Sequence, residues 1–158
     1  MLSTGGSSAL VGVSFCENSA AQGGGARITS GTATVRGSSF VENSATNLGG
    51  GLQVSMADGL LVSLATFLGN GADTLGGNLY VGDVTAEISD SLVAWVTAGD
   101  GLYVKNGTDH VLSHDAWYEN VDEDISGVLT VDDLDSTHLL ENPGASTCVL
   151  GDGCAARF

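Results

Sequence analysis

Basic residues are the scarcest class in this chain of 158 residues. Four lysines and arginines stand against 19 aspartates and glutamates, which gives a formal net charge of −15 at pH 7. A protein that neutralises a run of phosphates needs several cations, so this composition excludes nucleic acid as a partner. The same shortage excludes electrostatic attraction to an anionic lipid surface.

Proline and long apolar runs are scarce as well. The chain has one proline, and none of its apolar runs approaches the roughly 18 residues of a membrane span. No segment shows the periodicity that a helix of about ten residues would need. Glycine, in contrast, occurs 24 times, about twice its usual share of roughly 7%. With 42% hydrophobic residues, the chain can bury a core and is expected to form about one folded domain.

The acidic residues are unevenly distributed. Residues 1–79 contain four acids and two bases, whereas residues 80–158 contain 15 acids and two bases. The first half is therefore nearly neutral, and almost all of the net charge belongs to the second half.

A short motif recurs along the chain. Its copies begin at Phe15, Phe40, Phe67, Val93 and Trp117, at spacings of 25, 27, 26 and 24 residues. The first three copies read Phe-Cys-Glu-Asn-Ser-Ala, Phe-Val-Glu-Asn-Ser-Ala and Phe-Leu-Gly-Asn-Gly-Ala. A glycine-rich step and an alternating apolar segment follow each of the first four copies. Two motifs that recur in register indicate a repeat architecture.

The repeats have the periodicity of strands. Their apolar residues alternate in runs such as Leu52-Gln53-Val54, and glycine costs about 1 kcal/mol at a helical position. About 25 residues with two or three short strands and glycine turns form one coil of a parallel β-helix. Coils stack about 4.8 Å apart, so equivalent residues form ladders along the axis.

Four ladders are predicted from the repeat. The five motif positions that begin with Phe15 form the first, and the paired apolar residues of the glycine-rich segments form the second. The third contains Leu10, Val35, Val62, Ile88 and Leu112. The fourth is a turn ladder of side-chain amides from Asn18, Asn43, Asn70 and Asn120, which Val96 interrupts.

The pattern Phe-x-x-Asn-Ser-Ala followed by Gly-Gly-Gly resembles the right-handed parallel β-helix repeats of bacterial secreted and cell-surface proteins. It is similar to the pectin-lyase-like repeat family and to the Gly-Gly/Phe-x-x-Asn repeats of polymorphic outer-membrane proteins. The C-terminal part looks like the closing segment of such helices, at residues 114–120, 124–128, 138–139 and 143–146. The resemblance is to the group of these proteins whose members carry different kinds of C-terminal surface anchor. The resemblance implies an all-β, right-handed parallel β-helix of about five coils and an extracellular or cell-surface location.

We predict that residues 1–128 form the coils, the first of them incomplete, and that residues 129–158 form an acidic C-terminal cap. The N-terminal residues show neither a signal-peptide pattern nor a cap. An uncapped β-helix end exposes unpaired strand groups. We therefore expect further coils or a partner chain to cover this end.

One outward column is a candidate ligand site. Arg27, Gln53, Tyr80 and Tyr103 each stand in the middle of an alternating triplet and are predicted to point away from the core. Tyrosine rings and planar polar groups along a groove suit polysaccharide, whose sugars offer apolar faces and hydroxyl edges. The alternative is an ordinary exposed strand face, on which the same residue types are common.

No catalytic residues are assigned. A lyase would need a base beside carboxylates, and none of the four cations has an evident acidic cluster in its column. A hydrolase needs two carboxylates across a bond, and no clear outward pair is found. The favoured function is therefore a non-catalytic stalk or surface binding module of a secreted or cell-surface protein, with polysaccharide as the candidate ligand. The alternative is a fragment of a carbohydrate-active lyase, epimerase or hydrolase.

Metal and disulfide candidates lie near the C-terminus. No cofactor is predicted, although Asp122, Asp124, Asp132 and Asp133 are weak Ca²⁺ ligand candidates, with a solvated capping loop favoured. His110, His114 and His138 are interpreted as turn or solvated residues. Cys148 and Cys154 flank a short loop that a disulfide could close in an oxidising compartment, and Cys16 is predicted to be a lone thiol.

Overall fold

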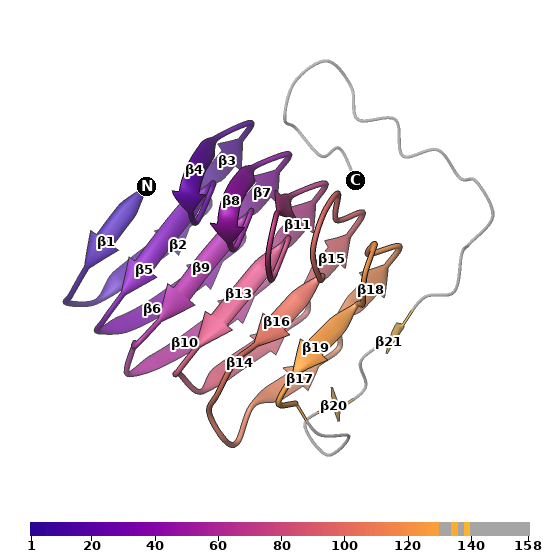
Figure 1. Ribbon diagram of the computed structural model, residues 1–158. Coiled ribbons are helices and arrows are strands. Elements are labelled where there is room, and N and C mark those ends of the chain that lie inside the picture. Colours follow the sequence, from indigo (N-terminus) through magenta and orange to yellow (C-terminus); the bar gives the residue numbers. More distant parts are fainter. Residues whose placement is uncertain (130–133, 136–137, 140–158) are drawn as a thin grey trace.

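The chain forms a parallel β-solenoid of about five turns, as seen in a computed structural model (Figure 1). The structure describes residues 1–129, 134–135 and 138–139. The described residues are all-β, and none of their elements is a helix that could cross a membrane. Each coil contributes strands to successive sheets, which we name A, B, C and D in chain order.

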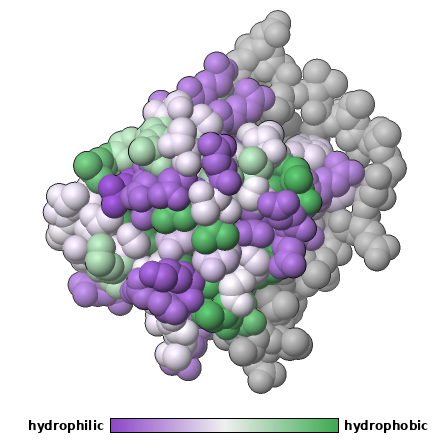
Figure 2. All heavy atoms as spheres, in the orientation of Figure 1, coloured by the Kyte–Doolittle hydropathy of each residue, from purple (hydrophilic) through white to green (hydrophobic). Residues whose placement is uncertain are grey.

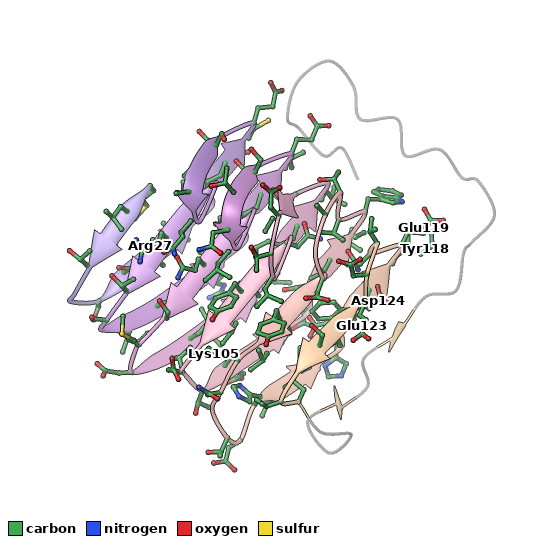
Figure 3. The ribbon with its side chains drawn as sticks, viewed as in Figure 1. Arg27, Lys105, Tyr118, Glu119, Glu123 and Asp124 are labelled. Carbon is green, nitrogen blue, oxygen red and sulfur yellow. The ribbon has the colours of Figure 1, made fainter. Side chains whose placement is uncertain are left out.

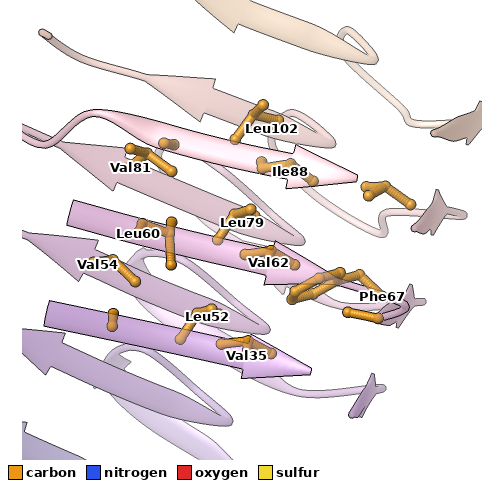
Figure 4. Packing of buried hydrophobic residues seen from close by; sticks show 14 of the residues in the cluster. Val35, Leu52, Val54, Leu60, Val62, Phe67, Leu79, Val81, Ile88 and Leu102 are labelled. Carbon is orange, nitrogen blue, oxygen red and sulfur yellow. The ribbon is translucent and has the colours of Figure 1, made fainter. Parts of the chain in front are cut away.

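Sheets A and B face each other across the core. The strands of sheet A are β1 (Leu2–Thr4), β5 (Ala26–Thr29), β9 (Leu52–Ser55), β13 (Leu79–Gly82), β16 (Leu102–Val104) and β19 (Ile125–Gly127). The strands of sheet B are β2 (Ser8–Val11), β6 (Thr32–Arg36), β10 (Gly59–Ser63), β14 (Ala86–Ser89), β17 (Val111–Ser113) and β20 (Leu134–Asp135). Figure 4 shows the apolar side chains packed between these strands.

Sheets C and D complete each coil. The strands of sheet C are β3 (Ser14–Cys16), β7 (Ser39–Val41), β11 (Thr66–Leu68), β15 (Leu92–Ala94), β18 (Ala116–Tyr118) and β21 (His138–Leu139). The short sheet D contains β4 (Ser19–Gln22), β8 (Ser44–Leu48) and β12 (Gly71–Ala72). All of the strand pairs described are parallel, as stacking of successive coils requires.

The predicted core ladders are confirmed. Phe15, Phe40, Phe67, Val93 and Trp117 pair in register along sheet C. The rings of Phe15 and Phe40 stack with their centroids 5.0 Å apart, and those of Phe40 and Phe67 stack at 4.7 Å. The ladder that runs from Leu10 to Leu112 lies in register along sheet B. All of these columns belong to one continuous buried cluster, which Phe15 joins at its edge.

The amide ladder is confirmed, and the structure shows how the break at Val96 is bridged. Asn18 Nδ2 donates to Asn43 Oδ1 at 2.9 Å, and Asn43 Nδ2 donates to Asn70 Oδ1 at 2.9 Å. Asn70 Nδ2 then donates to Asn78 Oδ1 at 2.7 Å, and Asn78 Nδ2 donates to Asn120 Oδ1 at 3.2 Å. Asn78 lies in the glycine-rich segment just before β13, so its side chain enters the ladder from a different part of the coil and replaces the missing amide.

Crowding explains the abundance of glycine. A Cβ atom added at Gly50 would lie against the carbonyl oxygens of Gly71 and Gly77 on the next coil. The chain can bring backbones this close only where a side chain is missing. The position two residues after each of the five motif anchors also recurs with positive φ, from 48° at Glu119 to 63° at Gly69.

Two strands continue the sheets beyond residue 128. Strand β20 pairs with β17, and β21 pairs with β18, so sheets B and C each gain a further strand. Leu129, the first residue of the predicted cap, packs against the core cluster, and the rest of the cap lies outside the described residues. At the other end, Leu2 and Val11 of the first coil are 63% and 62% exposed. Coverage of that end by further coils or a partner remains a prediction.

Candidate functional site

The four residues predicted to contact polysaccharide form one column on sheet A. Arg27, Gln53, Tyr80 and Tyr103 are paired in register across β5, β9, β13 and β16. The residues that flank Arg27 belong to the core cluster, so the column lies on the opposite side of the sheet. Figure 3 shows Arg27 near the N-terminal end of this sheet.

The column is more enclosed than strand alternation by itself suggests. Gln53 is 3% exposed and Tyr80 is 5% exposed, whereas Arg27 and Tyr103 are half-buried. Gln53 Nε2 donates to Ser55 Oγ at 3.2 Å. Within the described residues, the buried atoms Gln53 Oε1 and Arg27 Nε have no hydrogen-bond partner. Such unpaired buried atoms are uncommon in folded proteins, because each costs free energy.

The two tyrosines lie parallel to each other. The rings of Tyr80 and Tyr103 stack with their centroids 5.7 Å apart and their planes at 10°. Each ring covers one face of the other, so a sugar cannot stack between them. The other face of Tyr103 is turned toward Ser126, its partner in register on β19, whose small side chain covers little of a ring. On this side Tyr103 lies against a small residue and not another ring; Ser126 Oγ is itself buried and, among the described residues, has no hydrogen-bond partner.

Burial also affects the protonation of Tyr80. Burial raises the pKa of Tyr80, and the neighbouring Tyr103 and Asp83 raise this pKa further. The phenol therefore remains a hydrogen-bond donor at neutral pH. Next to the column, Asp83 accepts a hydrogen bond from Asn106 Nδ2 at 2.6 Å and forms an exposed ion pair with Lys105 at 3.7 Å. Lys105, the cation closest in sequence to Tyr103, is therefore paired with Asp83.

Two shallow hollows lie on the outer surface. One of about 400 Å³ is lined by Leu2, Gln22 and Arg27 at the N-terminal end of the column. The other, of about 340 Å³, is lined by Thr34, Leu61 and Glu87 on the outside of sheet B. On the face that carries sheet A, hydrophilic and hydrophobic residues are interspersed (Figure 2). Neither hollow has the depth of an enclosed pocket.

The metal candidates are only partly described. Asp122 is exposed, and Asp124 Oδ1 accepts a hydrogen bond from Asn120 Nδ2 at 2.7 Å. Asp132 and Asp133 lie outside the described residues. Among the residues that the structure does describe, no three His, Cys, Asp or Glu side chains are grouped so that they could hold a metal ion.

The three histidines occupy different positions in the coils. His110 is buried, and its Nδ1 accepts a hydrogen bond from the backbone N–H of Ala86 at 3.2 Å. His114 is exposed at the turn before β18, where its φ is 59°. His138 lies in β21. His110 therefore supports the backbone of the neighbouring coil.

One prediction about the cysteines is wrong. Cys16 is disulfide-bonded, whereas the sequence suggested a lone thiol. The prediction rested on the position of Cys16 next to an aromatic anchor. That position carries no information about a disulfide partner that is distant in sequence. Cys148 and Cys154, the predicted disulfide pair, lie outside the described residues.

The sequence analysis overlooked a buried carboxyl group. Asp115 is completely buried, and its Oδ1 accepts a hydrogen bond from the backbone N–H of Ser91 at 2.8 Å. The pKa of Asp115 is raised to about 6: burial is the largest cause and nearby Asp90 adds to it, while hydrogen bonds from Ser91 and Ser113 act in the opposite direction. Ser38 and Ser91 occupy equivalent positions in earlier coils and accept similar hydrogen bonds. The repeat spacing that relates Ser38, Ser91 and Asp115 could have identified Asp115 from the sequence as a hydrogen-bond acceptor for the preceding coil.

A second overlooked cluster lies on the last coils, where Figure 3 shows Tyr118 and Glu119 together. Glu119 accepts a hydrogen bond from Tyr118 Oη at 2.7 Å and another from Trp95 Nε1 at 3.0 Å. Burial and the Glu119 carboxylate raise the pKa of Tyr118 to about 12. These side chains connect two successive coils, so the cluster stabilises the stack.

Comparisons with protein-family models, with curated proteins and with solved structures find no match for this chain.

Proposed function

We propose that this chain is a non-catalytic, right-handed β-helix module of the pectin-lyase-like type that serves as a stalk or binding surface of a secreted or cell-surface protein. The observation that carries this proposal is the use of side chains between coils. The amide ladder, the stacked tyrosines and the Glu119 cluster all join one coil to the next. Such contacts suit a rigid spacer, because they tie each coil to its neighbour.

Secretion is supported by two features. The sequence resembles repeats of bacterial secreted proteins, and Cys16 is disulfide-bonded. Disulfides persist in oxidising compartments and are rare where thiols are kept reduced. The acidic surface of the second half would also keep an exposed stack soluble.

Polysaccharide is the proposed ligand of the sheet A column. Arg27 and the tyrosine hydroxyl groups provide donors along one line, and the half-buried ring of Tyr103 provides an apolar surface. A neutral polysaccharide fits best, since a net charge of −15 repels an anionic polymer.

A glycan-array screen followed by incubation with each bound glycan tests both parts of the proposal. We expect binding without cleavage. Tyr103→Ala should weaken binding by about tenfold or more, since a sugar–aromatic contact is lost. Leu61→Ala, on the outside of sheet B, is the matched control and should bind normally. Cleavage of a bound glycan would establish the enzyme alternative, and failure to bind any glycan would leave only the stalk.

A further inference from the structure

The chain contains two Asn-Gly dipeptides, and the fold places them in opposite environments. One is Asn70-Gly71, and the other is Asn106-Gly107. An asparagine followed by glycine loses its side-chain amide spontaneously with particular ease, because glycine has no side chain to hinder attack by its own backbone nitrogen. In a folded protein, this attack depends on whether the nitrogen and the asparagine side chain are accessible and free to move.

Asn70 and Gly71 are held inside the amide ladder. Asn70 is completely buried, and its Nδ2 donates to Phe40 O at 2.9 Å and to Asn78 Oδ1 at 2.7 Å. Its Oδ1 accepts a hydrogen bond from Asn43 Nδ2 at 2.9 Å. The backbone N–H of Gly71 donates to Asn43 O at 3.0 Å. The fold therefore occupies the attacking nitrogen and fixes the side chain that it would attack.

Asn106 and Gly107 lie instead in an exposed turn between sheets A and B. This turn spans residues 105–110, between β16 and β17, whereas the equivalent turn of the preceding coil spans only 83–85. Both Asn106 and Gly107 are exposed. Gly107 has a φ of 124°, and within the part of the chain that the structure describes no group accepts a hydrogen bond from its N–H. Its backbone nitrogen is therefore available for reaction.

The side chain of Asn106 contacts the turn of the preceding coil. Its Nδ2 donates to Asp83 Oδ1 at 2.6 Å, and Asp83 Oδ2 lies 3.7 Å from Lys105 Nζ. The contact engages the amide nitrogen, which is the group that would leave in the reaction. Because the side chain is exposed rather than enclosed in a ladder, its Cγ can still be reached by the Gly107 nitrogen.

We propose that Asn106 is a site of spontaneous deamidation and that the fold protects Asn70 from the same reaction. The backbone nitrogen of Gly107 attacks Cγ of Asn106, so a new N–C bond forms, the Cγ–Nδ2 bond breaks, and ammonia leaves with the proton of the attacking nitrogen. Water then opens the resulting succinimide ring at either carbonyl, which gives aspartate or isoaspartate. Water is the co-reactant, and no electrons are transferred. This inference does not depend on the proposed stalk or binding function.

Either product changes the contact between the two turns. A carboxylate at position 106 cannot donate to Asp83, and it places a second negative charge beside that side chain. Isoaspartate also adds a carbon atom to the backbone between β16 and β17. The reaction therefore weakens the contact that Asn106 makes with the preceding coil.

Incubation of the folded, full-length chain at neutral pH, followed by tandem mass spectrometry of its reduced tryptic peptides, tests the proposal. Asn70 lies in peptide 37–105 and Asn106 in peptide 106–157, so the two sites are observed separately. Deamidation of Asn106 should be faster by about tenfold or more, because Asn70 reacts only after local unfolding. In urea the two dipeptides should react at similar rates. Equal rates in the folded chain, or a folded chain that protects Asn106 as well as it protects Asn70, would overturn the proposal.

Asn106→Gln is the matched control variant. Glutamine keeps an exposed amide at this position, but its cyclisation needs a larger ring, which forms far more slowly. The variant should therefore remain unmodified at position 106 over the same period. The wild type should give both aspartate and isoaspartate, which electron-transfer fragmentation distinguishes, since the succinimide opens at either carbonyl. Aspartate alone would mean direct hydrolysis without the Gly107 nitrogen, and either that result or an equally fast loss of the glutamine amide would overturn the proposal.

Discussion

At the scale of single residues, Asp115 couples folding to pH. Its carboxyl group is completely buried, and burial raises its pKa to about 6. The usual pKa of an unfolded aspartate is about 3.9. Between these values the folded chain holds a proton that the unfolded chain has released. The free energy of unfolding must therefore fall as the pH rises from about 4 to about 6.

Asp115→Asn should remove this pH dependence. The amide oxygen can still accept the hydrogen bond from Ser91, and no charge is buried at neutral pH. We expect the variant to be more stable than the wild type by roughly 1–2 kcal/mol at pH 7 and similar to it near pH 4. Urea denaturation at both pH values measures the difference. Asp58→Asn, at an exposed site, is the control, and an equal pH dependence in wild type and Asp115→Asn would contradict the assignment.

Asn78 restores the amide ladder where Val96 interrupts it. Its Oδ1 accepts hydrogen bonds from both the backbone N–H and Nδ2 of Asn70, at 3.3 Å and 2.7 Å. Glycine occupies the equivalent position in the coils on both sides. The asparagine at position 78 therefore compensates for the valine at position 96.

Asn78→Gly should lower the free energy of unfolding by about 1–3 kcal/mol, since it leaves buried donors of Asn70 unpaired. The double variant Asn78→Gly/Val96→Asn recreates the regular pattern and should recover a large part of the loss. Guanidinium denaturation of the two single variants and the double variant gives the coupling energy. Strictly additive effects would show that the two positions act independently.

At the scale of elements, the aromatic ladder joins the strands of sheet C. Phe40 is completely buried, with the ring of Phe15 on one side and that of Phe67 on the other. Phe40→Ala should open a cavity in this ladder and cost about 3–5 kcal/mol. Leu61→Ala, an exposed position, should cost far less. A loss below about 1 kcal/mol for Phe40→Ala in a denaturant titration would contradict this packing.

At the scale of the whole molecule, uneven charge governs the response to salt. Most of the net charge of −15 lies in residues 80–158, and exposed acids such as Asp122 and Glu123 repel one another near the last coils. Screening weakens this repulsion, because the Debye length falls from about 30 Å at 0.01 M salt to about 10 Å at 0.1 M.

Thermal stability should therefore increase over this range of salt concentration. We expect a rise of a few degrees in Tm, measured by circular dichroism. The double variant Asp122→Asn/Glu123→Gln should show a smaller rise, because two of the repelling charges are absent. A Tm that falls with added salt would show that attractive ion pairs dominate instead.

Much of the fold was determined by the sequence alone. The spacing of 24 to 27 residues between anchors predicted the coils, and strand alternation predicted the core columns from Leu10 to Leu112. These predictions succeed because stacking repeats one local arrangement, so a residue and its equivalent in the next copy must be neighbours. The interrupted amide ladder was visible in the sequence for the same reason, although the repair by Asn78 was not.

Only the tertiary structure decided which outward columns are covered. Gln53, Tyr80 and Leu68 all occupy outward positions, yet each is nearly buried, while Leu61 remains exposed. Alternation along a strand separates two sides of a sheet, but exposure depends on what packs on each side. The disulfide at Cys16 and the burial of Asp115 likewise result from contacts between segments that are distant along the chain, which no local pattern encodes.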